Sequence, residues 1–142
     1  MNPTMAERLV IALLRLSGSG LMLAFLAVLL PVDWMAASHP RLGLGEFPRT
    51  PIVDYLTRSI AALYGFHGVF VWIVSFDPER YRVFVWFAAI MNIVFGAMMI
   101  AIDLHAGMPA LWTAIEGPSI MAAGVAIAAV ALRRSSGQAP RP

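Results

Sequence analysis

The chain contains no cysteine and no lysine, and only 13% of its residues are charged. The lack of cysteine excludes disulfides, thiolate metal sites, iron–sulfur clusters and covalently attached haem. All ten basic residues are arginine and the net charge is only +2, so the high isoelectric point of about 9.7 reflects the scarcity of carboxylates. No basic face would follow a phosphate backbone, and we expect no nucleic-acid partner.

Hydrophobic residues make up 60% of the chain and the mean hydropathy is +0.77, which is too apolar for an ordinary soluble domain. A helix needs about 20 apolar residues to cross a bilayer, and four segments come close to that length. We therefore predict one all-α domain over residues 1–134, an integral membrane four-helix bundle. Its predicted parts are helices at about 9–30, 51–76, 78–104 and 109–132, an outer loop at 31–50, and a flexible tail at 135–142.

Proline and glycine mark the predicted helix ends. Proline cannot continue a helix ladder from within but suits the first helical position, and glycine commonly follows the last one. Glycine and proline at four positions of the outer loop argue against a continuous helix there. Within the last helix, Gly117 and Pro118 predict a kink. The start signals are Thr50–Pro51, Asp77–Pro78 and Pro109, and the stop signals are Pro31 and Gly107.

The arginines also predict the orientation of the chain, because short cytoplasmic loops are enriched in basic residues. Six arginines fall on one side of the predicted spans and two on the other, with Arg58 at that second boundary. We therefore expect an up-down-up-down topology with both termini cytoplasmic, in the inner membrane of a bacterium. The six are Arg8, Arg80, Arg82, Arg133, Arg134 and Arg141, and the two are Arg41 and Arg49.

Four polar residues should approach the outer boundary of the bundle: Arg58, Asp103, His105 and Glu116. One interpretation is an outward-opening pocket in which Arg58 neutralises a carboxylate and His105 relays protons or holds a ligand. The other is an ion pair that ties helix ends together beside headgroup water. No catalytic motif, metal site or strand-linked phosphate loop accompanies these residues.

Four further polar residues are expected to be buried between the helices: Arg15, Tyr64, His67 and Asn92. His67 lies near mid-depth and is interpreted as hydrogen-bonded near Tyr64 or Asn92. Haem is not expected, because no second histidine falls at a similar depth on another helix. Arg15, about two turns inside the cytoplasmic end, is expected to reach toward Asp77 and Glu79, with a transport role as the alternative.

Small residues four apart should let the helices pack closely in lipid, where apolar burial adds little. Such pairs are Gly20 with Ala24, Ala61 with Gly65, and Gly124 with Ala128. On the third predicted helix, steps of four, three and four place a polar and small-residue stripe on one face, which should meet protein. The stripe contains Asn92, Gly96, Met99 and Asp103.

The runs TRSIAALYGFHG, DPERYR, DLHAGMP and EGP resemble the DoxX-like group of small four-helix membrane proteins over about the last two thirds of the chain. The long first loop and the Gly117–Pro118 break do not match, so no catalytic residue carries over. DoxX is linked to quinone-dependent oxidoreductase complexes, and the resemblance implies an accessory role. The residues that carry it are Arg58, Tyr64, Gly65, Asp103, Gly107, Pro109 and Glu116.

Together these features predict a non-catalytic accessory or structural component of a membrane complex, in contact with lipids and other membrane subunits and without a cofactor. The alternative is a quinone-linked or proton-handling subunit of a membrane oxidoreductase that uses Asp103, His105 and Glu116. A stand-alone transporter is the weakest interpretation, because inverted repeats and a midplane helix break are not evident.

Overall fold

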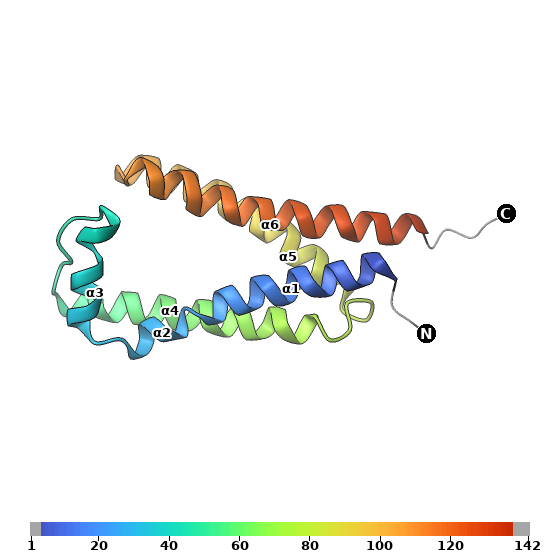
Figure 1. Ribbon diagram of the computed structural model, residues 1–142, viewed down its shortest axis with the longest axis horizontal. Coiled ribbons are helices and arrows are strands. Elements are labelled where there is room, and N and C mark those ends of the chain that lie inside the picture. Colours follow the sequence, from blue (N-terminus) through green and yellow to red (C-terminus); the bar gives the residue numbers. More distant parts are fainter. Residues whose placement is uncertain (1–3, 138–142) are drawn as a thin grey trace. The chain divides into compact units, whose positions relative to one another are not determined.

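The structure, a computed structural model, describes residues 4–137, with side chains described through Arg133. Over these residues the chain is all-α, with no strand. Most of the helical residues lie in the long helices α1, α4, α5 and α6. Three short helices, α2, α3 and η1, lie between α1 and α4 in the chain (Figure 1). In order these are α1 (Met5–Met22), α2 (Phe25–Leu29), α3 (Val32–Ser38), the 3-10 helix η1 (Pro40–Leu42), α4 (Pro51–Val74), α5 (Arg82–Ala106) and α6 (Ala110–Gly137).

Four stretches of helix are long and apolar enough to cross a membrane: Met5–Leu29, Pro51–Val74, Arg82–Ala106 and Ala110–Arg133. No more than 28% of the most apolar window in any of them is buried inside the protein. Their exposed large hydrophobic side chains are mostly leucine, isoleucine, valine and phenylalanine, which suits contact with lipid tails. The predicted all-α class with four apolar helices is confirmed, and it indicates a multi-pass membrane protein.

The chain divides into two compact units. Unit 1 contains the residues up to Ser17 and from Val71 onward, and unit 2 contains Gly18–Phe70. Helices α1 and α4 each contribute residues to both units, whereas α5 and α6 belong to unit 1 alone.

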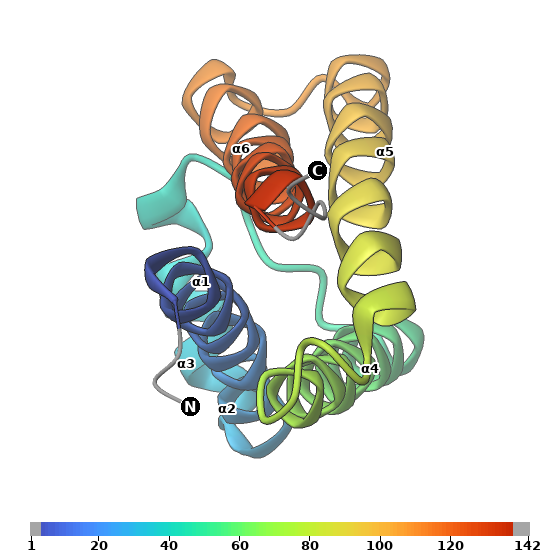
Figure 2. The ribbon, with the colours of Figure 1, turned by 90° about the vertical axis from the view of Figure 1, so that its right-hand side faces the viewer.

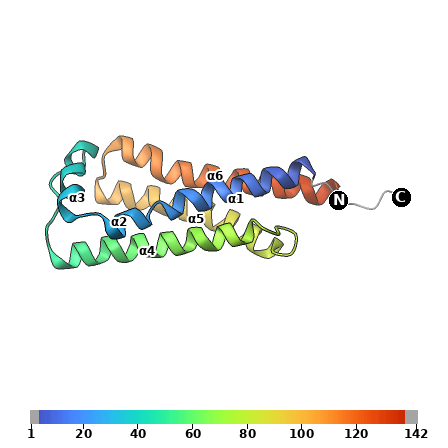
Figure 3. The ribbon, with the colours of Figure 1, turned by 60° about the horizontal axis from the view of Figure 1, so that its bottom comes forward.

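In unit 1, α5 and α6 form an antiparallel hairpin (Figure 3). The turn is made by Gly107, whose φ of 68° lies in the left-handed region that glycine adopts without strain. The backbone N–H groups of Gly107 and Met108 both donate to the carbonyl of Asp103. The predicted stop at Gly107 is therefore confirmed, and α6 begins at Ala110, directly after Pro109.

The hairpin packs through glycine. A Cβ added to Gly96 would lie 2.6 Å from the carbonyl oxygen of Gly117, and one added to Gly117 would lie 2.6 Å from that of Gly96. Both positions therefore admit only a hydrogen, and Gly124 approaches the carbonyl of Ala89 in the same way. Toward the other end of unit 1, buried residues of all four long helices form one core: Val10, Leu14, Val71, Val74, Val85, Ala89, Ile127 and Ala131.

In unit 2, the end of α1 and then α2 run antiparallel to α4 (Figure 2). Gly68 faces the backbone of Gly18, and the ring of Phe25 covers Gly65. Among the predicted small-residue positions, Gly65 and Gly124 are close-packed, whereas a Cβ on Gly20 would meet nothing within 4 Å.

Several predicted boundaries differ from the structure. The first predicted helix is interrupted at Leu23 and Ala24, where N–H groups bond three residues back as in a 3-10 turn. The predicted outer loop is not continuous helix, but it contains α3 and η1. Helix α6 extends to Gly137 and continues through Pro118, so the predicted end at about residue 132 is too early. The remainder of the predicted tail, residues 138–142, lies outside the described residues.

The predicted starts of the second and third helices share one signal, a capping residue followed by proline, but only the start of the second helix is confirmed. The Thr50–Pro51 start is confirmed, since the Thr50 side chain accepts from the Val53 N–H at 3.4 Å. Asp77, by contrast, accepts from the Arg80 N–H at 3.0 Å and so caps a turn. Helix α5 begins only at Arg82. Residue 81 takes a non-helical conformation, which ends the turn before α5 begins.

Candidate functional site

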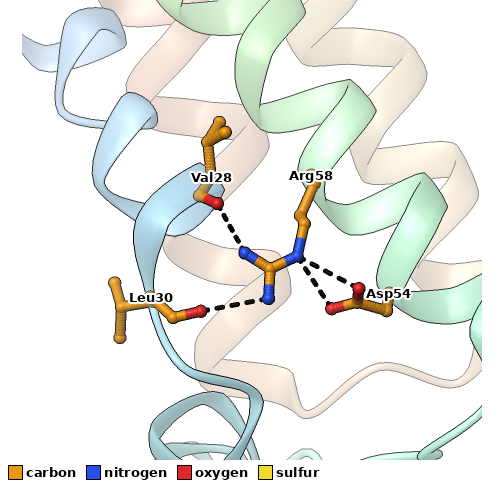
Figure 4. Close-up of polar contacts among 4 residues, drawn as sticks. All are labelled: Val28, Leu30, Asp54 and Arg58. Atoms are coloured by element: carbon orange, nitrogen blue, oxygen red, sulfur yellow. Dashed lines mark hydrogen bonds and ion pairs between the residues drawn. The ribbon is translucent and has the colours of Figure 1, made fainter.

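The best-partnered charged group near the end of a candidate span is Arg58, on the second turn of α4 (Figure 4). Its Nε donates to both carboxylate oxygens of Asp54 at 2.9 and 3.1 Å, one helical turn earlier. Its two terminal nitrogens donate to the backbone carbonyls of Val28 and Leu30, the second at 3.1 Å. The guanidinium therefore joins α4 to the chain at the end of α2.

This arrangement follows from the local sequence. Pro31 disfavours helical conformation at Leu30, which is extended with ψ 134°, and α2 ends at Leu29. A helix end leaves carbonyl groups without N–H partners, and an arginine near it can satisfy them and interact favourably with the helix dipole. Arg58 supplies these donors from a neighbouring helix, while its Nε binds the Asp54 carboxylate.

The second charged group is Asp103, one turn before the end of α5. Its side chain is almost fully buried, with 2% of the residue exposed. The oxygen Oδ2 is inaccessible and has no hydrogen-bond partner among the described residues. An unpaired buried acceptor is costly, so a hydrogen-bond donor placed beside Asp103 would stabilise it.

The other two predicted site residues are accessible. Glu116, on α6, is half-buried and accepts a hydrogen bond from the indole N–H of Trp112. His105, in the last turn of α5, is exposed. Asp103, His105 and Glu116 thus all lie on the α5–α6 hairpin of unit 1, near its turn.

Arg58 belongs to unit 2, and all of its described hydrogen bonds stay within that unit. The predicted neutralisation of an α5 or α6 carboxylate by Arg58 is not among those bonds. A pocket shared by Arg58 and the three hairpin residues stays a prediction.

Arg15 differs from its predicted setting, because it is exposed and not buried. Its Nε donates to the hydroxyl of Ser75 at 3.4 Å. Its guanidinium lies 5.2 Å from the ring centre of Trp72 and 5.9 Å from that of Phe76. The expected approach to Asp77 or Glu79 is replaced by a hydroxyl and two aromatic rings, which attract a cation through their π faces.

The remaining predicted buried polar residues, Tyr64, His67 and Asn92, are half-buried. The His67 ring stacks on Phe70 with centroids 6.4 Å apart. No group of three or more histidine, aspartate or glutamate side chains that could hold a metal ion occurs within residues 4–133.

Some participating groups were missed by reasoning from sequence. The carbonyls of Val28 and Leu30 carry no side-chain signature, although Pro31 indicates a helix end that needs partners. Ser75 is fully buried and donates to the carbonyl of Trp72 at 2.6 Å. The Trp-x-x-Ser-Phe run at the end of α4 was the available signal for the Arg15 environment.

These features define a class of all-α membrane protein with two polar sites near helix ends. One is the Arg58–Asp54 pair at the end of α2, and the other is the buried Asp103. No family model, curated protein or solved structure matches the chain.

Proposed function

We propose that this chain is a small, non-catalytic membrane protein that serves as an accessory or structural component of a membrane complex. The observation that carries the proposal is the environment of Arg58. A charged group near a membrane boundary is costly unless it is partnered, and it is a functional candidate by default. Here the two terminal nitrogens of the guanidinium join α4 to the end of α2 and Nε binds Asp54 within α4, which is a structural use.

On this proposal the chain crosses the inner membrane of a bacterium four times, up-down-up-down, with both termini in the cytoplasm. Four helices of sufficient length and apolarity support the four crossings. The excess of arginine at the end that carries the termini and the α4–α5 turn supports the orientation. The outer loop and the α5–α6 turn then face the periplasm, where Glu116 and the exposed His105 are available to a partner or a lipid headgroup.

The resemblance to the DoxX-like group supports the accessory role, since DoxX is linked to oxidoreductase complexes. The proposed partners are membrane lipids and other membrane subunits, and no cofactor is assigned to the chain itself.

A second candidate function is a quinone-linked or proton-handling subunit of a membrane oxidoreductase. The specific observation in its favour is Asp103, whose buried Oδ2 has no partner in the described part of the chain. A donor group such as a quinol hydroxyl would supply the missing partner of that oxygen, and His105, two residues further on, is exposed. A quinone beside these residues would be the redox cofactor.

The test of the first proposal is the native mass of the protein extracted from its own membrane in a mild detergent, with identification of co-purifying proteins. An accessory subunit runs as part of a large assembly with defined partners. A chain that runs alone, or as a small homo-oligomer, at every detergent concentration that preserves known complexes of the same membrane contradicts the accessory role.

The second candidate is tested in that same assembly by comparing Asp103→Asn with Asp33→Asn. Asp33 is a matched control because it is an exposed aspartate, paired with Arg49 on the outer segment. A proton-handling subunit loses electron transfer on Asp103→Asn alone. Equal activity in both variants, with the assembly intact, would exclude the second candidate.

A further inference from the structure

Arg15 is unusual among the arginines of this chain because it lies well inside a candidate membrane span and yet has no acidic partner among the described residues. It is ten residues after the start of α1, which corresponds to about 15 Å along the helix axis. Near the centre of a bilayer an unpaired arginine would cost about 2.5–3.5 kcal/mol. The depth of the Arg15 guanidinium in the bilayer therefore decides which partners it can bind.

The residues that Arg15 contacts at the end of α4 indicate the depth of its guanidinium. The candidate span on α4 ends at Val74, and the Arg15 Nε contacts the hydroxyl of the next residue, Ser75. Since Ser75 also precedes a polar turn that contains Asp77, the Arg15 guanidinium is level with an end of a span. That level is the headgroup region, where arginine and tryptophan are both favourable.

The same contacts orient the guanidinium. Arginine has five N–H donors, one on Nε and four on the terminal nitrogens. Ser75 takes the Nε donor, and the rings of Trp72 and Phe76 lie beside the guanidinium. Over residues 4–133 the terminal nitrogens have no acceptor, although the residue is exposed. Two parallel N–H groups in this fork match the oxygens of a phosphate.

The charge at this end of unit 1 has the matching sign. Helix ends that carry arginine lie at this end, because the core of unit 1 joins the N-terminal parts of α1 and α5 to the end of α4 and the C-terminal half of α6. The exposed arginines of this end are Arg8, Arg15, Arg80, Arg82 and Arg133, against the acids Glu7, Asp77 and Glu79.

From these observations we infer that Arg15, held by Ser75, Trp72 and Phe76, binds the phosphate of an anionic phospholipid at the arginine-rich end of unit 1. The headgroup phosphate accepts from the Arg15 fork, and the lipid tails extend from it into the bilayer. This site does not include Arg58, Asp103, His105 or Glu116, and it does not depend on whether the protein belongs to a larger assembly.

The test is lipid binding to the delipidated full chain in a mild detergent, counted by native mass spectrometry. The probes are short-chain phosphatidylglycerol, which is anionic, and short-chain phosphatidylcholine, which is zwitterionic. The unaltered chain should bind phosphatidylglycerol more tightly, and Arg15→Gln should weaken that binding about ten-fold, the lower end of the range for a hydrogen bond to a charged group. Arg133→Gln is the matched control, since it removes the same charge from the same end, and it should weaken binding less than two-fold.

Four outcomes would overturn the inference. Equal weakening by Arg15→Gln and Arg133→Gln would show that only the net charge matters. Displacement of the lipid by millimolar inorganic phosphate would point to a free-anion site, and loss of a co-purifying protein from Arg15→Gln with lipid binding unchanged would point to a protein partner. If Arg15→Gln does not fold, Ser75→Ala keeps the charge but removes the orienting hydroxyl, and unchanged phosphatidylglycerol binding by that variant would equally overturn the inference.

Discussion

At the scale of single residues, two charged groups near the ends of candidate spans differ in their hydrogen-bond partners. Arg58 is half-buried and every nitrogen of its guanidinium has an acceptor. Asp103 is nearly inaccessible and one of its oxygens has none in the described structure. The first arrangement stabilises the fold and the second costs stability, so substitution at the two positions should have opposite effects.

Arg58→Ala should lower the free energy of unfolding by about 1.5–3 kcal/mol, the range for hydrogen bonds that involve a charged group. The loss arises because the carbonyls of Val28 and Leu30 are left without their donors and Asp54 without its partner. Thermal unfolding in detergent, followed by circular dichroism, measures it. Arg41→Ala is the control, because Arg41 is exposed on η1. Equal melting temperatures for the two variants would contradict the structural role of Arg58.

Asp103→Asn should leave the melting temperature unchanged or raise it, because the substitution removes a buried carboxylate while keeping the shape of the side chain. The backbone carbonyl that receives the Gly107 and Met108 N–H groups is not altered. Asp54→Asn is the matched substitution with the opposite expectation, because Asp54 is paired with Arg58. A large fall in stability for Asp103→Asn would mean that the carboxylate itself holds the fold together.

At the scale of helices, the α5–α6 hairpin depends on backbone contact at glycine. In lipid, helices associate through close packing of small residues, so a methyl group at a contact point acts directly on association. Gly117 has a second role, because the residue before a proline suffers a clash that involves its Cβ. With no Cβ there, α6 continues through Pro118 and still meets Gly96. The sequence spacing places Gly96 on the stripe that should meet protein, but it does not pair Gly96 with Gly117, since that pairing depends on the register between two helices.

Gly96→Ala should destabilise the protein by about 1–3 kcal/mol, the usual cost of overpacking a close contact. The new methyl group would meet the backbone of Gly117 and Met121, which cannot rotate away. Gly20→Ala is the control, because open space surrounds that position and alanine favours a helix by up to about 1 kcal/mol over glycine. Thermal unfolding of both variants in the same detergent gives the comparison, and a Gly96→Ala variant as stable as Gly20→Ala would disprove the close contact.

At the scale of the whole molecule, the proposed orientation makes a prediction that the absence of cysteine renders simple to test. Leu42→Cys, on the outer segment, should react with a membrane-impermeant maleimide in intact cells. Glu79→Cys, in the α4–α5 turn, should react only after the membrane is opened. Neither substitution changes an arginine, so the charge bias that sets the orientation is preserved. Labelling of Glu79→Cys in intact cells would reverse the proposed topology.

The sequence by itself determined the class of the protein, its four apolar helices, the helix start at Thr50–Pro51 and the turn at Gly107. These features are local, because hydropathy over about 20 residues, a proline ring or a glycine with positive φ acts within a few turns of chain. The tertiary structure decided that Arg58 binds the carbonyls at the end of α2 and that Arg15 lies level with the end of α4. Those contacts join residues 28–60 positions apart. They depend on which turns of two helices lie side by side, and no local sequence pattern specifies that.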